Sequence, residues 1–554
     1  MFDFIVIGSG PSGATIAARL AKSPSKPRIL LLEAGKSYLQ DKWLMGFDRW
    51  PLALDSSPLH LGLSSEPQPH LDGREIPLPT GRALGGSSTI NVGMWTVGHE
   101  ADYNEWARMV NDDSYSWPEI RRHLQRLENY GSDISPVLRD YSQPEEWHGK
   151  KGNIYAEFSG DDLAKAGPIL SAFVEKGHPV NTDVNSGRSL GVGVVPITTK
   201  NSWRVSAATA HLVDPPSNLE IINDAVVSRV ILEDGKATGV VVGETVYHAT
   251  KEVIISAGAL KSPQLLMLSG IGPKDVLQSV GIESVRDLPV GQTLQDHLCF
   301  PLLWEVDPSL GDSVNWLFDP SVVTRHRDEF LEHGTGPLKN FYSPMPIVYV
   351  RDAAIANSTA IDGLPSDVRR HLSNSDLPLA EVCPVLPSFG PDQSKSYLRV
   401  SGFPMATQSV GSIRLRSRSI EDQPLVDPKY LSTQFDVENA IALVRVVKDA
   451  LQGSSLAPRV GKLVMGPQSD SDEGILQYIK QSVISAWHYG CSIKMGPSDD
   501  GTCSVDANFR VFGIRNLRVA DTSVLPFLPQ CHTQAVAYLI GEILAEKLLD
   551  EYDL

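Results

Sequence analysis

The sequence has few cysteines and none of the spacings that organise a disulfide framework or a zinc site. Its five cysteines are an odd number and include no C-x-x-C pair, so we expect free buried thiols. The chain also has no H-E-x-x-H segment and no paired Cys/His spacing, and we predict no metal. These absences argue against disulfide-stapled domains and zinc enzymes.

Long apolar runs and clusters of basic residues are missing as well. No run is long enough to span a bilayer, and the net charge is -17, so we expect neither a nucleic acid nor a membrane as a partner. The chain enters its first strand without a basic segment and an apolar segment ahead of it, so we expect no secretory signal and a cytoplasmic location.

The length sets the scale of the fold. With 554 residues the chain exceeds one typical hydrophobic core, so we expect two domains, or one large domain with insertions.

A glycine-rich turn near the N-terminus organises the rest of the sequence. Phe4–Ile7 is a short apolar run typical of a strand buried on both faces. It leads into Gly8, Gly10 and Gly13 in the pattern G-x-G-x-x-G, alanines then recur at helical spacing, and Ile29–Leu32 forms a second buried strand. This order predicts a βαβ unit, in which the glycines let a pyrophosphate approach backbone N–H groups at a helix N-terminus.

Glu33 stands at the end of that second strand, 20 residues after Gly13. A carboxylate there can accept hydrogen bonds from ribose hydroxyls and disfavours a ribose 2′-phosphate, so a dinucleotide other than NADP is expected. A chance glycine turn is the alternative, but the strand, the helix and the acid at this distance favour dinucleotide binding.

The middle of the chain returns to the same kind of fold. Gly81–Asn91 places small residues where a backbone must lie close to a ligand or to another chain segment. Leu219–Ile222, Val226–Leu232 and Ala237–Val242 suggest an antiparallel meander, and Lys251–Ala259 is again a buried strand that runs into small residues.

A second sheet is expected between residues 300 and 480, where Met345–Val350 and Ser396–Val400 are β-like. The chain then closes with a strand over Ile514–Ala520 and an amphipathic helix with Val536 and Leu539 on its apolar face.

With these segments in place, the chain resembles the glucose-methanol-choline (GMC) oxidoreductases, a family of FAD-dependent enzymes. The resemblance rests on five ordered matches: the glycine turn, Gly81–Thr96, Ser256–Pro273, Gly291–His297, and the block from Val505 to Pro526. It implies an α/β fold, in which an FAD-binding Rossmann-like domain (1–150, 215–300 and 480–554) is interleaved with an α+β substrate-binding domain built on an antiparallel sheet (151–214 and 301–479).

The resemblance also implies which residues hold FAD. The expected contacts with the pyrophosphate, ribose, adenine and flavin come from Gly8, Gly10, Gly13, Glu33, Ala34, Gly86, Ser87, Asn91, Val92, Val227, Asp521 and His532. Some relatives carry a histidine at the position of Asn91 that bonds FAD covalently, so asparagine here implies non-covalent FAD.

The catalytic residues implied by the resemblance are His488 and His532. His488 lies in Trp487–Ser492, which resembles a W-H-P-x-G-T segment but carries Tyr489 in the proline position and Cys491 in the glycine position. His532 precedes the last helix. His488 is the expected base, and His532 is expected to hold the substrate oxygen.

Two imidazoles suit this chemistry. Moving a hydride from an alcohol carbon to flavin N5 requires loss of the hydroxyl proton, and an imidazole with a pKa near ~6.5 accepts it at neutral pH. The helix after His532 would point its positive end at the reduced flavin.

The implied activity is oxidation of a small-molecule alcohol, with O2 or another acceptor taking the electrons and the protein acting as a monomer or homodimer. Two alternatives stay open, a lyase of the hydroxynitrile-lyase type and a formate-oxidase-like enzyme. The formate-oxidase branch has arginine where this chain has His532. Gly187–Gly191 fits the nucleophile pattern G-x-S-x-G without the required strand and helix, so it is interpreted as chance.

Overall fold

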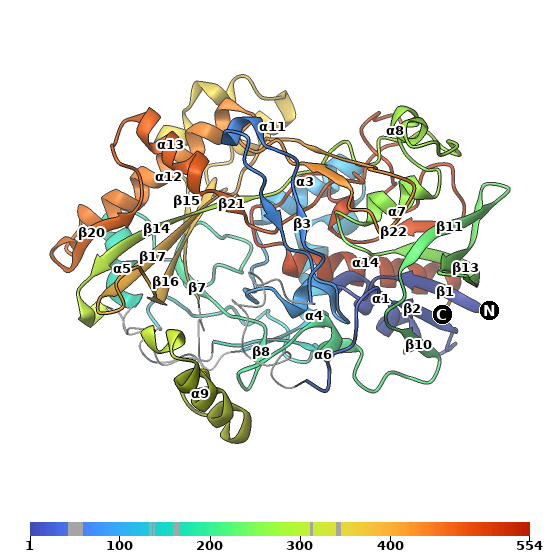
Figure 1. The fold of residues 1–554 in the computed structure, drawn as a ribbon, viewed down its shortest axis with the longest axis horizontal. Helices are drawn as coiled ribbons and strands as arrows, with labels where there is room; N and C mark the ends of the chain where they lie inside the picture. The colour runs from blue at the N-terminus through green and yellow to red at the C-terminus, as the bar shows by residue number, and fades with distance from the viewer. Residues whose placement is uncertain are drawn as a thin grey trace.

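The computed structural model describes residues 1–41, 59–131, 134, 136, 139–158, 166–310, 314–339 and 345–554. Two seven-stranded sheets dominate it, one at the right of Figure 1 beside both chain termini and one at the left. The cavity that contains the candidate site lies between them, because residues from both sheets line it.

The first sheet combines a parallel core with an antiparallel edge, in the order β10-β2-β1-β13-β12-β11, with β22 also paired to β13. The long strand β13 joins the two parts: Thr245–His248 pairs antiparallel with β12, while Glu252–Ile255 pairs parallel with β1. The strands are β1 Phe2–Ile7, β2 Ile29–Leu32, β10 Leu219–Ile222, β11 Val227–Glu233, β12 Lys236–Val242, β13 Thr245–Ile255 and β22 Leu517–Val519.

One strand of this sheet differs from the expected meander. Leu219–Ile222 pairs parallel with Ile29–Leu32 as β10 and β2, and the meander consists instead of β11, β12 and β13. Local strand propensity gives no information about partner or direction, so the sequence identified the strand but not its place.

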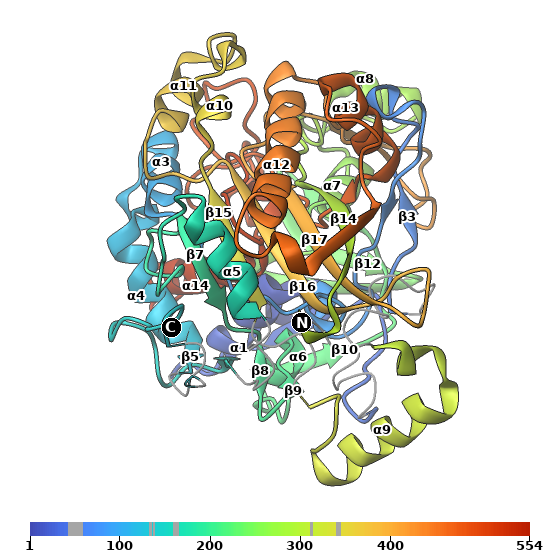
Figure 2. The same ribbon diagram turned by 90° about the vertical axis from the view of Figure 1, so that its left-hand side faces the viewer.

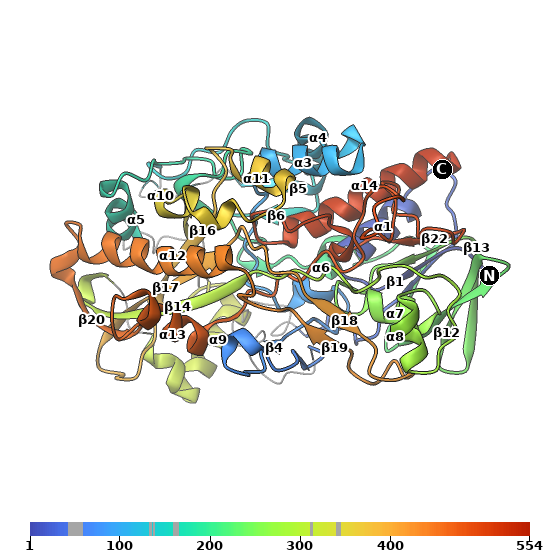
Figure 3. The same cartoon turned by 90° about the horizontal axis from the view of Figure 1, so that it is seen from above.

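Helices cover the first sheet. α1 (Pro11–Ala21) and α14 (Gln534–Tyr552) lie side by side, as Figure 3 shows. A Cβ added at Gly541 of α14 would come 2.6 Å from the backbone oxygen of Ser12 in α1. A glycine is therefore needed where these two helices cross. α7 (Ser262–Leu268) lies near β11.

The second sheet is antiparallel, in the order β20-β14-β17-β16-β15-β7, with β21 paired to β14. Its helix α12 (Gln434–Gln452) runs across the strands in Figure 2. The strands are β7 Gly191–Val195, β14 Leu298–Val306, β15 Met345–Val350, β16 Ala380–Ser388, β17 Ser396–Pro404, β20 Val460–Met465 and β21 Ile484–Ser485.

The remaining named elements surround these layers. The helices are α3 Glu100–Val110, α4 Trp117–Leu127, α5 Ala166–Glu175, α6 Ala207–His211, α8 Lys274–Ser279, α9 Pro320–His333, α10 Ala353–Ala356, α11 Ser366–Leu372 and α13 Asp472–Ser482. The 3-10 turns are η1 Pro69–Leu71, η2 Gly86–Thr89, η3 Asp113–Tyr115, η6 Pro308–Leu310, η7 Asn315–Phe318, η8 Thr359–Ile361, η9 Ala457–Arg459 and η10 Thr522–Val524. The short strands are β3 Leu63–Ser64, β4 Pro77–Leu78, β5 Glu128–Tyr130, β6 Ile154–Ala156, β8 Thr199–Lys200, β9 Trp203–Arg204, β18 Ser412–Arg414 and β19 Leu425–Asp427.

The predicted α/β class with an antiparallel second sheet is confirmed by this arrangement. Among the described residues, no helix is both long enough and apolar enough to cross a bilayer.

Candidate active site

The glycine turn joins β1 to α1 and opens into the cavity. A Cβ added at Gly8 would lie 2.3 Å from the backbone oxygen of Ser256, and one at Gly13 would lie 2.0 Å from the backbone oxygen of Gly8. At Gly10 an added Cβ would meet no protein atom within 4 Å. Gly8 and Gly13 therefore permit close packing of the backbone, whereas Gly10 keeps space open for a ligand.

Glu33 is held rigidly beside that turn. Its Oε2 accepts hydrogen bonds from the backbone N–H of Ser9 at 3.0 Å and from the Ser9 hydroxyl at 2.6 Å. Its Oε1 accepts one from the N–H of Gly35 at 2.8 Å. Burial raises the pKa of the Glu33 carboxyl, while these hydrogen bonds oppose the rise. The carboxyl group is thereby fixed in orientation at the cavity wall.

A cavity of about 340 Å³ extends from the turn to the second sheet. All the residues expected to contact FAD line the cavity except Gly13, which packs against the backbone of the turn at Gly8. The lining members of that set are Gly8, Gly10, Glu33, Ala34, Gly86, Ser87, Asn91, Val92, Val227, Asp521 and His532.

Asn91 is fixed by two side chains from distant parts of the chain. Its Oδ1 accepts a hydrogen bond from Arg204 Nη1 at 2.9 Å, and its Nδ2 donates to Gln534 Oε1. Arg204 also donates to the backbone oxygen of Ser88. Neither Arg204 nor Gln534 was among the residues expected to contact FAD. Arg204 lies outside the recognised family segments, and Gln534 ends the segment Pro529–Gln534 that carries His532.

Asp521 ties the C-terminal block to the middle of the chain. Its Oδ2 accepts hydrogen bonds from the N–H of Gly258 at 2.9 Å and from the hydroxyl of Ser262 at 2.6 Å. Its Oδ1 accepts one from the N–H of Ser523 at 2.8 Å. The Asp521 carboxyl group therefore joins the Ser256–Pro273 segment to the C-terminal block. Both segments belong to the matches on which the expected dinucleotide site rests.

The two predicted catalytic histidines lie next to each other in the wall of the cavity. Nε2 of His488 lies 3.0 Å from Nδ1 of His532, and their ring centroids are 4.6 Å apart. The loop that carries His488 is backbone-strained, since both Trp487 and Cys491 have positive φ values of 63° and 66°. The backbone N–H of His488 donates to Asp296 Oδ1 at 2.8 Å, which fixes that loop.

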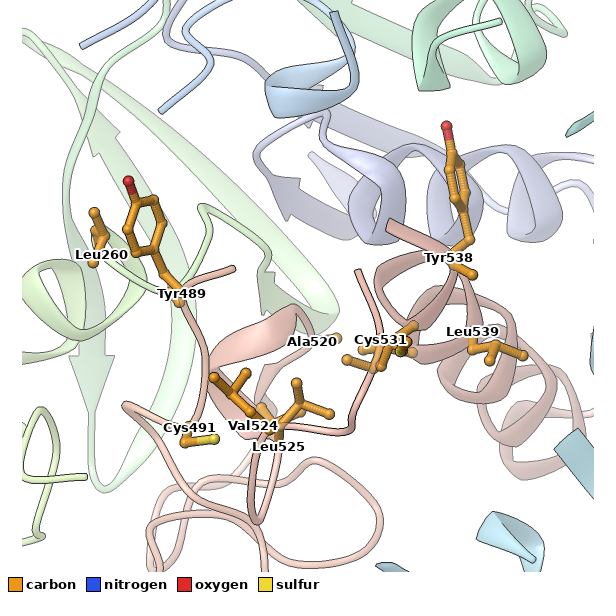
Figure 4. Packing of buried hydrophobic residues seen from close by; sticks show 14 of the residues in the cluster. Leu260, Tyr489, Cys491, Ala520, Val524, Leu525, Cys531, Tyr538 and Leu539 are labelled. Carbon is orange, nitrogen blue, oxygen red and sulfur yellow. The ribbon is translucent and has the colours of Figure 1, made fainter. Parts of the chain in front are cut away.

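Hydrophobic packing holds the residues next to both histidines. Figure 4 shows Tyr489 directed toward Leu260, and Cys491 against Val524 and Leu525. Cys531 lies between that group and α14 in the same figure. Apolar side chains replace the proline and glycine of the family segment, so packing and the positive φ of Cys491 shape this loop.

Two further titratable groups, His297 and Glu381, extend the pair, and neither was among the predicted site residues. Nδ1 of His297 lies 3.0 Å from Nδ1 of His488. Nε2 of His532 lies 2.7 Å from Oε1 of Glu381 in β16. The same oxygen accepts a hydrogen bond from the thiol of Cys383 at 3.0 Å. His297 ended a recognised family segment, whereas Glu381 was only an isolated acid in an apolar run.

His297, His488, His532 and Glu381 form a row of neighbouring titratable groups, and the electrostatics differ between its two ends. Burial, and then the neighbouring His532 and His297, hold the pKa of His488 well below its usual range. Burial lowers the pKa of His297 to about 4. Burial alone would raise the pKa of Glu381, but the adjacent His532 outweighs it, and the carboxyl stays below its ordinary value. Negative charge therefore sits at the Glu381 end.

The donor atoms of Glu381, Cys383 and His532 all lie within 4.8 Å of one another, a spacing that could enclose a metal ion. However, the imidazole and the thiol both donate to one carboxylate oxygen. We therefore interpret the group as a hydrogen-bonded acid–base cluster.

One wall of the cavity thus offers a dinucleotide turn, and the other offers paired imidazoles, which is the layout of a cofactor-dependent oxidoreductase. Two family models described as GMC oxidoreductase match residues 2–299 and 407–541. The chain belongs to the GMC oxidoreductase family, whose enzymes use FAD and act on alcohol-like or choline-like donors.

Curated relatives extend over the whole chain. An alcohol dehydrogenase [acceptor] of Pseudomonas putida is 31% identical over 580 residues, covering 100% of this chain and 97% of that protein. An oxygen-dependent choline dehydrogenase of Brucella anthropi is 31% identical over 571 residues, covering 99% of this chain and 95% of that protein.

Solved structures share the complete fold. The pyridoxine 4-oxidase from Mesorbium loti superposes with a TM-score of 0.81 at 26% identity, and 99% of each chain is covered. A variant of the Aspergillus oryzae RIB40 formate oxidase superposes with a TM-score of 0.88 at 25% identity, covering 100% of this chain and 98% of that chain.

The described residues fit FAD. At both Gly10 and Gly258 an added Cβ would meet no protein atom within 4 Å, although the two backbones line the same cavity. Space is thus left beside the backbone where a pyrophosphate needs it. Glu33 at the end of β2 would accept hydrogen bonds from a ribose, and Asn91 and His532 line the same cavity.

Proposed function

We propose that this protein oxidises an alcohol with non-covalently bound FAD and that His488 and His532 handle the hydroxyl group. The observation that carries the proposal is the pair of imidazoles, with nitrogens 3.0 Å apart, in a cavity continuous with the dinucleotide turn. FAD, when bound, supplies the acceptor for the hydride that leaves the alcohol carbon.

The histidines suit an alcohol because one can donate to its oxygen while the other accepts its proton. His488 is fully enclosed, and its lowered pKa keeps the imidazole neutral at neutral pH. A neutral imidazole has one N–H donor and one bare nitrogen. The resemblance makes His488 the base and His532 the group that holds the oxygen.

The cavity lining indicates the character of the alcohol. Beyond the histidines, many of its side chains are apolar or sulfur-containing, among them Met94, Cys299, Met345, Phe403 and Ile484. A sugar needs many hydrogen-bonding partners when it leaves water, and an apolar alcohol does not. We therefore propose an aliphatic or aromatic alcohol as substrate.

The buried carboxylate of Glu381 disfavours the formate-oxidase-like alternative. It lies 2.7 Å from His532, so a substrate carboxylate at the histidines would face a second negative charge in a site of low polarity. The similarity to the formate oxidase therefore supports a shared fold rather than a shared substrate.

The electron acceptor is O2 or another oxidant. The two relatives described above differ on this point, since one is described as oxygen-dependent and the other by an unspecified acceptor. Measuring peroxide formation in air with the identified alcohol separates the two possibilities.

We also propose that residues 1–150, 215–300 and 480–554 form the FAD-binding domain and that 151–214 and 301–479 form the substrate-binding domain. The distribution of strands supports this division. The first sheet uses segments at 2–32, 219–255 and 517–519, and the second uses 191–195 and 298–465. The exception is β21 (484–485), which pairs with β14 of the second sheet but lies within the 480–554 segment.

An anaerobic screen tests the proposal. The purified protein is mixed with 1-alkanols, benzyl alcohols, choline and glucose, and flavin absorbance is followed. We expect bleaching by at least one apolar alcohol and faster reduction than by glucose. A lyase of the hydroxynitrile-lyase type would cleave a cyanohydrin with its flavin remaining oxidised, and that result would replace the proposal.

A further inference from the structure

We infer that Arg399 of β17 determines substrate specificity, and that the preferred alcohol carries a carboxylate at the end remote from its reacting hydroxyl. The body of this substrate stays aliphatic or aromatic, in keeping with the rest of the cavity lining. The inference rests on the proposed function, because it names the class of alcohol that the histidine pair oxidises.

Arg399 lies on the face of the second sheet that forms the cavity wall. Phe403, Ser401 and Arg399 alternate along β17, and all three line the cavity. Side chains alternate between the two faces of a strand, so these three share one face. The intervening residues point the other way, since an added Cβ at Gly402 would lie 3.2 Å from Leu443 of α12. Arg399 therefore faces the cavity, and α12 covers the opposite face.

The register of the sheet places Arg399 away from the histidines. The ring centroids of Phe403 and His532 are 5.4 Å apart, and Phe403 pairs across the sheet with Glu381. Arg399 pairs with Val385, four residues further along β16. Four residues of a strand span about 13 Å. The Phe403 end of this face is thus the histidine end, and Arg399 marks the other end.

The two ends of this face carry opposite charges. Glu381 places a carboxylate beside His532, whereas a guanidinium is always protonated, so Arg399 places a cation at the other end. The acids among the described lining residues are Glu33 and Asp521, and hydrogen bonds hold both within segments of the first sheet side. A substrate carboxylate is therefore attracted at the Arg399 end and repelled at the Glu381 end.

The thiols on the same wall do not offset this cation. Cys299 of β14 and Cys383 of β16 both line the cavity. Burial raises the pKa of Cys299 to about 12, although the charge of Arg399 opposes the rise. Burial also holds the pKa of Cys383 well above its usual value. Both thiols are neutral at neutral pH, and the field of Arg399 reaches into the cavity as far as Cys299.

A carboxylate suits this cation best. The planar guanidinium can donate two parallel hydrogen bonds to the two carboxylate oxygens. Between the two ends, side chains such as Met345, Val385 and Phe403 favour a hydrocarbon chain or an aromatic ring. These observations together favour ω-hydroxy acids and (hydroxymethyl)aryl carboxylic acids. The same charge disfavours an alcohol with a cationic end, such as choline.

The first test needs no turnover, so it separates failure of this inference from failure of the proposed function. para-Methylbenzoate and its methyl ester have no hydroxyl group to be oxidised, and their affinity for the FAD-loaded protein is measured by calorimetry. We expect the acid to bind wild type roughly 10- to 100-fold more tightly than the ester, the range for a hydrogen bond between charged groups. Equal affinities, or tighter binding of the ester, would overturn the inference.

Three variants assign this preference to Arg399. Arg399→Gln removes the charge, and Arg399→Lys keeps it. Arg445→Gln is the control, because Arg445 lies in α12, outside the cavity lining, and is paired with Asp472. We expect the preference for the acid to vanish in Arg399→Gln, to persist in part in Arg399→Lys and to match wild type in Arg445→Gln. A preference that survives in Arg399→Gln would assign the acid to another cation and overturn the inference.

A third measurement uses wild type alone, so it stands even where Arg399→Gln does not fold. Anaerobic flavin reduction is compared for para-(hydroxymethyl)benzoate, ortho-(hydroxymethyl)benzoate and benzyl alcohol. We expect half-saturation by the para acid at a concentration roughly 10- to 100-fold below that of benzyl alcohol. The ortho acid should be the poorest of the three, because its carboxylate would lie near Glu381. No advantage of the para acid, or a better ortho acid, would overturn the inference.

Discussion

Nε2 of His532 and Oε1 of Glu381 lie 2.7 Å apart although 151 residues separate them in the chain. His532 precedes α14, which covers the first sheet, and Glu381 belongs to β16 of the second sheet. The contact therefore exists only when both halves of the molecule are folded and docked. It links the cofactor side of the cavity to the substrate side.

The glycine turn gives the first prediction. Gly10→Val should yield folded protein that purifies without flavin, because the added side chain meets no protein atom but enters the space left for the pyrophosphate. Gly501→Val is the control, since its Cβ also meets no protein atom and Gly501 lies outside the cavity lining. Flavin absorbance and a thermal melt measure both effects. A yellow Gly10→Val protein would contradict this account.

Gly13 should behave differently from Gly10. A Cβ there would stand 2.0 Å from the backbone oxygen of Gly8, a distance that requires movement of the helix or the turn. We expect Gly13→Ala to lower the free energy of unfolding by several kcal/mol, roughly 2–4, and to reduce soluble yield. Urea unfolding of the two variants distinguishes lost stability from lost cofactor binding. Equal stability of Gly13→Ala and wild type would rule out tight packing at this position.

The mode of FAD attachment is a third prediction. Asn91 is engaged by Arg204 and Gln534, and an amide does not form the bond that a histidine forms with FAD in some relatives. Acid precipitation should release all flavin into the supernatant, where chromatography identifies it as intact FAD. Flavin that stays with the washed pellet would show a covalent link.

A buried histidine outside the cavity lining predicts a pH dependence of stability. His148 lies between Glu128 at 2.8 Å and Asp183 at 3.1 Å. Burial alone would lower the pKa of His148, but these carboxylates raise it to about 9. Because the folded pKa exceeds the unfolded value near ~6.5, the stabilisation is fully present below about pH 6.5 and is lost as the pH rises through about 9.

The size of this effect can be measured. The shift corresponds to about 3 kcal/mol, so urea unfolding should show a loss of this order between pH 6 and pH 10. His148→Gln should be less stable at pH 6 and should lose much less on the way to pH 10. Exposed His333 supplies the control, and His333→Gln should follow the wild-type curve. Parallel curves for wild type and His148→Gln would contradict the assignment of charge to His148.

Local sequence patterns predicted much of the fold. The buried run before Gly8, the alanine spacing after it and the run before Glu33 predicted β1, α1 and β2, which the structure contains. Each of these elements depends on residues close in sequence. The partner of β10 was missed because strand pairing depends on residues nearly 200 positions away, between Ile29 and Leu219.

The candidate site shows the same limit. Residues inside family segments, such as His488 and Asp521, could be proposed from the sequence because each segment carries several matching residues. Glu381 could not, since its importance arises from the alternation of β16, which directs it toward a histidine from the other sheet. The hydrogen-bonded row of His297, His488, His532 and Glu381 could likewise be found only from the observed nitrogen and oxygen neighbours.

The central claim is that an apolar alcohol is oxidised at this histidine pair with His488 as proton acceptor, and anaerobic stopped-flow reduction of His488→Asn and His532→Asn across pH tests it most directly. The account predicts that His488→Asn slows flavin reduction by roughly 100- to 10,000-fold and removes the acidic limb. His532→Asn, whose amide can still hold the substrate oxygen, should lose less and retain the limb, with FAD bound in both. The reverse pattern would make His532 the base, and wild-type flavin that no alcohol bleaches would contradict the proposed function itself.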